Sequence, residues 1–209
     1  MRGLAKFFFW TGLVLGIICG LLYAFVFDLW VIPADDDNLA AALEPQLAPG
    51  DTVLVSRSTS PDVGQLVRCA DPDAPGRFVV ARVIGKAGDV LDINGATFQY
   101  NGHSVSSPNA CDPPRVTVRN PITKEDEELP CSNEEFAGIT HPALRAGIEN
   151  RKHVEVEGGQ VYLLSDNRAM YLDSRDFGPV PAHSCQRVSF RLWGSGGFTD
   201  SKHRMSVVW

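Results

Sequence analysis

The N-terminal part of the chain is almost continuously apolar. No charged residue occurs between Phe7 and Phe27, and the apolar character continues past a single aspartate to Ile32. A helix needs about 20 apolar residues to cross a bilayer, so the pattern predicts one transmembrane helix over residues 7–32. A cleaved signal peptide would have a shorter apolar core, of about 7 to 15 residues. This favours an uncleaved anchor, although the small residues at 40–42 resemble a cleavage site.

The charges on either side of this segment predict its orientation. Arg2 and Lys6 precede it, and three consecutive aspartates, residues 35–37, follow it. Because basic flanking residues tend to stay in the cytoplasm, we expect residues 1–6 to be cytoplasmic and the main domain to be external. In a bacterium this arrangement corresponds to the inner membrane, with the domain in the periplasm.

After the anchor the chain consists of short runs rich in β-branched and aromatic residues, separated by turn signals such as Asn-Gly and Gly-Gly pairs. The runs lie at residues 52–55, 65–69, 78–84, 90–93, 97–100, 116–118, 154–156, 161–164, 188–192 and 206–209. Such runs are typical of strands. They predict a mainly β fold, an antiparallel, barrel-like or two-sheet domain. One segment, Glu134–Ile148, favours a helix, although it contains a proline and two glycines.

Composition narrows the possible functions. The chain has 209 residues, of which 44% are hydrophobic, with 14 Pro and 19 Gly, and this suits one turn-rich domain beside a membrane segment. A net charge of -6 argues against a nucleic-acid partner, which would require a basic face. The five histidines show no metal-ligand spacing. We therefore expect neither a metal nor another cofactor.

The cysteines agree with an external domain. Cys19 falls inside the expected membrane helix, which leaves an even set of four that can form disulfides. Of the three possible pairings we favour Cys111 with Cys131, because that bridge would stabilise the polar insertion between them by roughly 3 kcal/mol through loop closure. Cys69 with Cys185 then follows by elimination. The alternatives are reduced, buried thiols or, less favoured because Cys-x-x-Cys spacing is missing, a zinc site.

A loop after the apolar run at 161–164 carries two sets of opposite charges. It reads Ser-Asp-Asn-Arg at 165–168 and Asp-Ser-Arg-Asp-Phe-Gly-Pro-Val at 173–180. On spacing alone, this is typical of a solvated loop pinned by ion pairs. Its order also resembles the Gly-Asp-Asn-Arg…Asp-Ser-Arg-x-aromatic-Gly-x-Val box of type I signal peptidases. The resemblance implies structural roles for the residues of this box, Asp166, Asn167, Arg168, Asp173, Ser174 and Arg175.

The segment before the first expected strand resembles the part of these enzymes that carries the nucleophile. Residues 43–51 are similar to the family's Met-x-Pro-Thr-Leu-x-x-Gly-Asp, which follows the nucleophilic serine. Matching Pro45 and Gly50 places that serine on Ala42. The serine two residues earlier, which helps to bind the oxyanion in the family, falls on Ala40. Both hydroxyl groups are therefore missing.

A third segment, at 78–89, resembles the family box that contains Lys-Arg and ends in Gly-Asp. The family's general-base lysine falls on Ala81, and the following arginine is Arg82. Alternate residues of a strand face opposite sides, so Ala81 would face the cleft and Arg82 would point away from it, toward Asp166. The family residue that often orients the base, a Ser or Thr, falls on Tyr171. A Ser–Lys dyad needs a hydroxyl nucleophile and an amine that takes its proton, and alanine supplies neither.

These patterns predict a linker with a degraded nucleophile segment at 33–50 and an external domain at 51–209, with an insertion at 106–150. The resemblance implies a natural, catalytically inactive relative of the signal peptidases. It could be an accessory subunit or assembly factor of a membrane complex, whose cleft either holds an exported, extended segment without cutting it or is vacant or covered. The alternative is an active membrane-bound signal peptidase with a displaced nucleophile. Glycines at 12, 16 and 20 could dock the anchor on another membrane helix.

Overall fold

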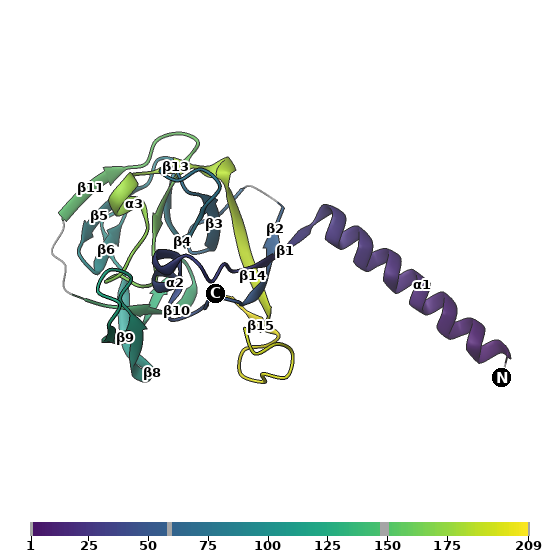
Figure 1. Cartoon of the computed structure of the whole chain (residues 1–209). Coiled ribbons are helices and arrows are strands. Elements are labelled where there is room, and N and C mark those ends of the chain that lie inside the picture. Colours follow the sequence, from purple (N-terminus) through teal and green to yellow (C-terminus); the bar gives the residue numbers. More distant parts are fainter. Residues whose placement is uncertain (1, 58–59, 147–150, 209) are drawn as a thin grey trace.

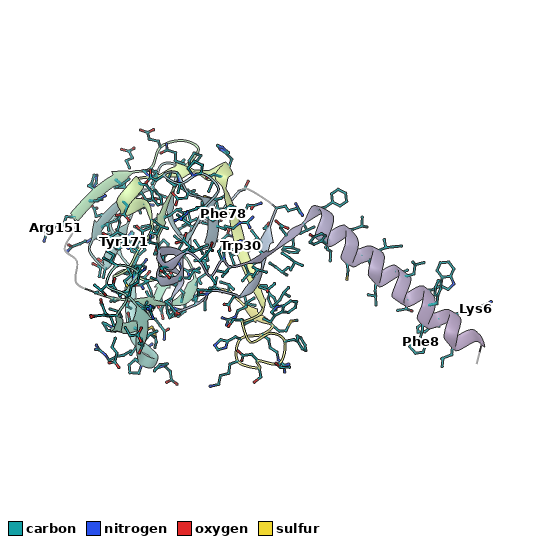
Figure 2. The ribbon with its side chains drawn as sticks, in the orientation of Figure 1. Lys6, Phe8, Trp30, Phe78, Arg151 and Tyr171 are labelled. Carbon is teal, nitrogen blue, oxygen red and sulfur yellow. A yellow bond between two sulfur atoms is a disulfide. The ribbon has the colours of Figure 1, made fainter. Side chains whose placement is uncertain are left out.

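In the computed structural model, which describes residues 2–57, 60–146 and 151–208, a long N-terminal helix projects from a β domain (Figure 1). Helix α1 spans Arg2–Phe25. Its stretch Lys6–Tyr23 is long and apolar enough to cross a membrane. Lys6 and Phe8 lie far out on this helix, away from the domain (Figure 2). The described residues thus contain one helix suited to anchoring in a membrane, consistent with the hydrophobic pattern.

The helix is shorter than predicted. It ends at Phe25, and the remaining apolar residues form strand β1, Phe27–Val31, rather than the end of the helix expected over 7–32. β1 pairs antiparallel with β2, Thr52–Ser56. Trp30 on β1 packs edge-to-face against Phe78, with ring centroids 5.9 Å apart (Figure 2). The pairing and this aromatic contact with the domain explain why an apolar run becomes a strand here.

The largest sheet has eight strands in the order β1-β2-β14-β3-β4-β12-β13, with β15 paired to β14. All its pairings are antiparallel. The remaining strands of this sheet are β3 (Leu66–Ala70), β4 (Phe78–Lys86), β12 (Gln160–Leu164), β13 (Val180–Pro181), β14 (Cys185–Trp193) and β15 (Ser206–Val207). β4 lies near the centre of this sheet and carries Ala81 and Arg82.

Two smaller antiparallel sheets flank the large one. One has the order β11-β5-β6-β7 and consists of β5 (Val90–Asn94), β6 (Thr97–Tyr100), β7 (His103–Ser104) and β11 (Arg151–Glu155). The other has the order β10-β9-β8 and consists of β8 (Ser106–Arg119), β9 (Asp126–Phe136) and β10 (Ile139–Leu144). Every predicted strand run overlaps one of the strands, although Gln65, Val156 and Val208 lie just outside them and Trp209 lies outside the described residues. The mainly β, antiparallel prediction is confirmed.

The predicted helix at Glu134–Ile148 is wrong. Its described part belongs to β9 and β10, which form a tight hairpin in which Phe136 pairs with Ile139. The turn between them consists of Ala137 and Gly138, with φ values of 51° and 76°. Two consecutive positive φ values match the right-handed twist of a two-residue hairpin. Residues 147–150, the end of the predicted helix, lie outside the described residues.

Three short helical segments complete the domain, and none of them was predicted. Helix α2 spans Asp37–Leu43, and the Asp36 carboxylate caps its N-terminus by accepting a hydrogen bond from the Leu39 N–H at 3.0 Å. α2 lies against β4 and buries Leu39 and Leu43 beside Val80. The other two are α3, Ser174–Phe177, and a 3₁₀ turn, Ala182–Ser184.

Both disulfides follow the favoured pairing. Cys69 on β3 is bonded to Cys185 on β14, and the two residues are also partners in the strand register. Cys111 on β8 is bonded to Cys131 on β9. The first bond joins two neighbouring strands of the large sheet across a sequence separation of 116 residues, and the second joins the strands of the insertion. Both bonds lie in the domain beyond α1.

Candidate functional site

Arg82 on β4 and Asp166 on the loop after β12 form a buried bidentate ion pair. Arg82 Nε donates to Asp166 Oδ1 at 3.0 Å, and Nη2 donates to Oδ2 at 2.7 Å. A third nitrogen, Nη1, donates to the carbonyl oxygen of Gly64 at 2.7 Å. The Arg82 side chain is 0% exposed. Asp166 is the partner that was predicted for Arg82 from the alternation of side chains along β4. Bidentate geometry is the strongest form of an arginine–carboxylate contact.

The next residues of the loop connect it to the insertion and to α2. Arg168 Nη2 pairs with Glu134 Oε1 on β9 at 2.7 Å, and both side chains are 0% exposed. Asn167 Nδ2 donates to the carbonyl oxygen of Ala41 at 2.8 Å. Burial alone would raise the pKa of the Glu134 carboxyl, but the charges of Arg168, His141 and Arg145 lower it to about 2. Glu134 is therefore a fixed negative charge in the interior.

His141 on β10 lies between the two carboxylates. Its Nε2 is 3.3 Å from Glu134 Oε1 and 3.5 Å from Asp166 Oδ1. Burial lowers the pKa of His141, and the two carboxylates only partly offset it. Glu134 and His141 were not predicted as site residues, because both fall in the segment that was expected to be a helix. No local signal marks them, since they meet the loop only through the hairpin register that pairs them.

The second half of the loop folds back on itself. Asp173 pairs with Arg175 at 2.8 Å and also accepts from the N–H of Ser165 at 2.8 Å. The Ser174 hydroxyl accepts from the Leu163 N–H at 3.0 Å. The Arg175 guanidinium lies 3.5 Å from the ring centroid of Tyr171 (labelled in Figure 2), a cation–π contact. All the box residues named from the sequence are thus buried and engaged in holding the loop.

The positions matched to the catalytic residues lie in the apolar interior. Ala81 is 0% exposed and packs on the same face as Val79 and Val83, in a cluster that also contains Val67. Ala42, on α2, is 2% exposed. Neither side chain offers a proton donor, an acceptor or a nucleophile. The third position, Ala40, is half-buried and lines a cavity beside α2.

Two lysines near the matched positions are held in ion pairs. Lys86, the lysine nearest to Ala81 along the chain, forms an exposed ion pair with Asp62 at 2.7 Å. The hydrogen bond and the charge of Asp62 raise the pKa of Lys86, whereas a general-base lysine needs a lowered one. Lys124 near α2 is likewise paired with Asp37 at 2.7 Å. Among the described residues, no group of three or more His, Cys, Asp or Glu side chains could hold a metal ion.

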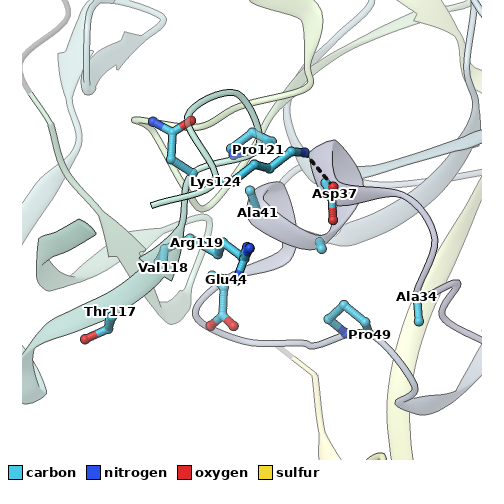
Figure 3. A pocket seen from close by; sticks show the side chains of 12 residues that line it. Ala34, Asp37, Ala41, Glu44, Pro49, Thr117, Val118, Arg119, Pro121 and Lys124 are labelled. Atoms are coloured by element: carbon cyan, nitrogen blue, oxygen red, sulfur yellow. Dashed lines mark hydrogen bonds and ion pairs between the residues drawn. The ribbon is translucent and has the colours of Figure 1, made fainter. Parts of the chain in front are cut away.

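The cavity beside α2 has a volume of about 270 Å³ and separates α2 from the β8–β9 hairpin (Figure 3). Its lining consists of Ala34, Asp37, Ala40, Ala41, Glu44, Pro49, Thr117, Val118, Arg119, Asn120, Pro121 and Lys124. Burial, with a contribution from the negative charge of Asp51, raises the pKa of the Glu44 carboxyl to about 7. The Lys124–Asp37 pair, drawn dashed in Figure 3, lies on the other side of the lining from this carboxyl.

We expect Asp166→Asn to lower the free energy of unfolding by about 3–5 kcal/mol, because Arg82 is then a buried charge without its counter-ion. Urea denaturation of the detergent-solubilised protein measures this change. Asp62→Asn, which breaks the exposed pair with Lys86, is the matched control and should cost less than about 1 kcal/mol. Equal losses in the two variants would contradict the structural role of the buried pair.

Glu44→Gln should change how stability depends on pH. The folded-state pKa of about 7 lies above the ordinary glutamate value of 4.5, so the stabilising effect of the protonated carboxyl is lost as pH rises from about 4.5 to 7. Relative to Glu44→Gln, the unmodified protein should therefore lose about 1–3 kcal/mol between pH 4.5 and pH 8, after allowance for partial exposure. Denaturation curves of both proteins across this range measure it. A constant difference would show that Glu44 titrates normally.

Comparison with known proteins places this architecture in a family. The family model described as signal peptidase, peptidase S26, matches residues 5–193. Among solved structures, a signal peptidase I from Enterococcus faecalis is similar, with 23% sequence identity, coverage of 61% of this chain and 95% of that chain, and a TM-score of 0.36. A comparison with curated proteins finds no match. Because the family model covers nearly the whole chain, the protein belongs to the signal peptidase family, peptidase S26.

Proposed function

We propose that this chain is a non-catalytic member of its family that acts as a membrane-anchored accessory subunit or assembly factor of a membrane protein complex. One observation carries the proposal. Ala42 and Ala81, which match the family's nucleophile and general base, have no reactive group and are 2% and 0% exposed. In a serine protease the loss of the nucleophile or of its base costs about 10⁶ in turnover. Loss of both would leave no useful peptidase activity.

The packing on the Ala81 face of β4 supports a subunit rather than a holder of extended peptides. Leu172 and Phe177, both partly buried, pack against the cluster that contains Val79, Ala81 and Val83. A peptide that lay over this face of β4 would have to displace these two side chains. Two cavities flank α2, and neither is lined by Ala42 or Ala81. We therefore favour a covered cleft over an open one.

The anchor and the disulfides support an external domain. A single helix suited to cross a membrane precedes the domain, and the two disulfides lie beyond that helix. Disulfides persist outside the cytoplasm. We place the N-terminus in the cytoplasm and the β domain in the bacterial periplasm, with the inner membrane between them. A partner complex in the same membrane would then meet both α1 and the domain.

We expect no cleavage when the detergent-solubilised protein is incubated with a preprotein. Installing Ser at 42 and Lys at 81 should not restore activity, because Ala81→Lys buries an amine in an apolar cluster and should cost several kcal/mol of stability. Thr97→Lys, on the exposed edge of β6, is the control and should change stability by less than about 0.5 kcal/mol. Preprotein processing by the unmodified protein that disappears on replacing a single serine would mean that it is an active peptidase.

The subunit role predicts a defined complex. Full-length tagged protein, extracted in mild detergent and analysed by quantitative mass spectrometry, should carry one set of membrane proteins in fixed proportion. Gly16→Leu should reduce their recovery if the glycine face of α1 docks on them, because a Cβ added at Gly12, Gly16 or Gly20 would meet no other part of the described structure within 4 Å. Gly3→Leu, outside that stripe, is the control. Recovery of diverse exported peptides would favour a peptide-holding role instead, and recovery of the protein alone would contradict both.

A further inference from the structure

The carboxyl of Glu44 has no partner in the described structure. It follows directly after α2 and lines the cavity of about 270 Å³ next to the β8–β9 hairpin. Within residues 2–57, 60–146 and 151–208, its side chain makes no hydrogen bond and no ion pair. A carboxylate that is partly removed from water is stabilised by a counter-ion or a proton. Glu44 is half-buried at the wall of the cavity, so this requirement applies to it in part.

The charged groups around Glu44 do not meet that requirement. Asp51 adds negative charge, and His203, the only cation among the causes of the pKa shift, has the smallest effect of the three. Lys124 is held at 2.7 Å by Asp37. Arg119 acts electrostatically on Asp37 as well. In Figure 3 the Glu44 carboxylate points away from the Lys124–Asp37 pair. Apart from that pair, the lining carries one carboxyl, that of Glu44, and one further cation, that of Arg119.

The size and lining of the cavity suit a side chain. Its volume of about 270 Å³ is well above what a single water molecule needs. Most of the other lining residues are small or apolar, namely Ala34, Ala40, Ala41, Pro49, Val118 and Pro121. Such walls suit the methylene stem of a lysine or arginine, whose apolar part packs while its cation reaches a polar partner.

We propose that this cavity receives a lysine or arginine side chain from a partner protein, whose cation pairs with Glu44. The proposal rests on the accessory-subunit function and names the kind of contact that its partner makes. A cation at Glu44 would form a charge-assisted hydrogen bond with a carboxylate that already lies in a partly desolvated wall. The partner's side chain would be held between α2 and the hairpin, and thus on the segment in which active relatives carry their nucleophile.

The raised pKa of Glu44 agrees with this geometry and makes the contact dependent on pH. With a pKa of about 7, the carboxyl is mostly protonated at pH 5.5 and mostly ionised at pH 8. A cation binds the ionised form. Binding should therefore release a proton near neutral pH, and its affinity should be at least about tenfold higher at pH 8 than at pH 5.5.

The test uses the full-length protein in detergent micelles and the peptide acetyl-Gly-Ala-Lys-Ala-Gly-amide, with binding measured by calorimetry. We expect saturable binding at pH 8 that weakens at least tenfold in Glu44→Gln. Glu155→Gln, which removes an exposed carboxyl from β11, should change the affinity less than twofold. Ala40→Leu, which places bulk in the cavity and keeps Glu44, should also weaken binding. The same peptide with an acetylated lysine, or with glutamate in its place, should not bind.

Three results would overturn the proposal: no saturable binding, equal affinity in Glu44→Gln, or equal binding of the acetylated peptide. Binding that appears only in Arg119→Ala would also overturn it, since Arg119 would then be the natural partner of Glu44 in solution. n-Butylammonium that matches the lysine peptide in affinity would assign the site to a small amine instead of a protein side chain. A negative result leaves the subunit proposal intact, because that proposal is tested by preprotein cleavage and by complex recovery.

Discussion

The buried pair between Arg82 and Asp166 is the constraint on which the arrangement of the domain depends. Asp166 belongs to a loop that also bonds through its backbone to the insertion, where the Leu144 N–H donates to the Asp166 carbonyl oxygen at 2.8 Å. One residue later, Asn167 holds α2 through Ala41. Arg82 thus connects the large sheet, the β9–β10 hairpin and α2 through a single loop.

Desolvation makes this network cooperative. Arg82, Asp166, Glu134 and Arg168 are all 2% exposed or less. A buried ion loses far more from the removal of its partner than a surface ion does, because it cannot recover its hydration. His141 adds a titratable group between the two carboxylates. Because its pKa is lowered, protonation of His141 at low pH destabilises the folded network. The buried ions therefore specify one arrangement of the loop, the hairpin and α2. This effect on specificity is distinct from a contribution to the free energy of unfolding.

The sequence contained much of this fold, but only the part encoded by local patterns. The strand runs were recognisable because they are rich in β-branched and aromatic residues and turn signals lie between them. The end of α1, the helix α2 and the β9–β10 hairpin were not, because each depends on distant contacts: Trp30 on Phe78, Leu39 beside Val80, and Glu134 on Arg168. The box loop and Arg82 were predicted through a resemblance in residue order. Glu134 and His141 do not belong to a segment that resembles a family motif. Their role is recognisable only in the structure, where the β9–β10 register pairs them.

The adjacent residues Ala81 and Arg82 have separate structural surroundings. They point to opposite faces of β4, so the arginine that holds the box loop and the position of the base can change independently. Glu44 departs from this logic. It lies outside the ion network and has no partner among the described residues, and its raised pKa means that it lowers stability near neutral pH. A glutamine would avoid that loss at the same size. Functional sites are enriched in carboxyls with shifted pKa values, which directs attention to the wall of α2 as well as to the positions matched to the dyad.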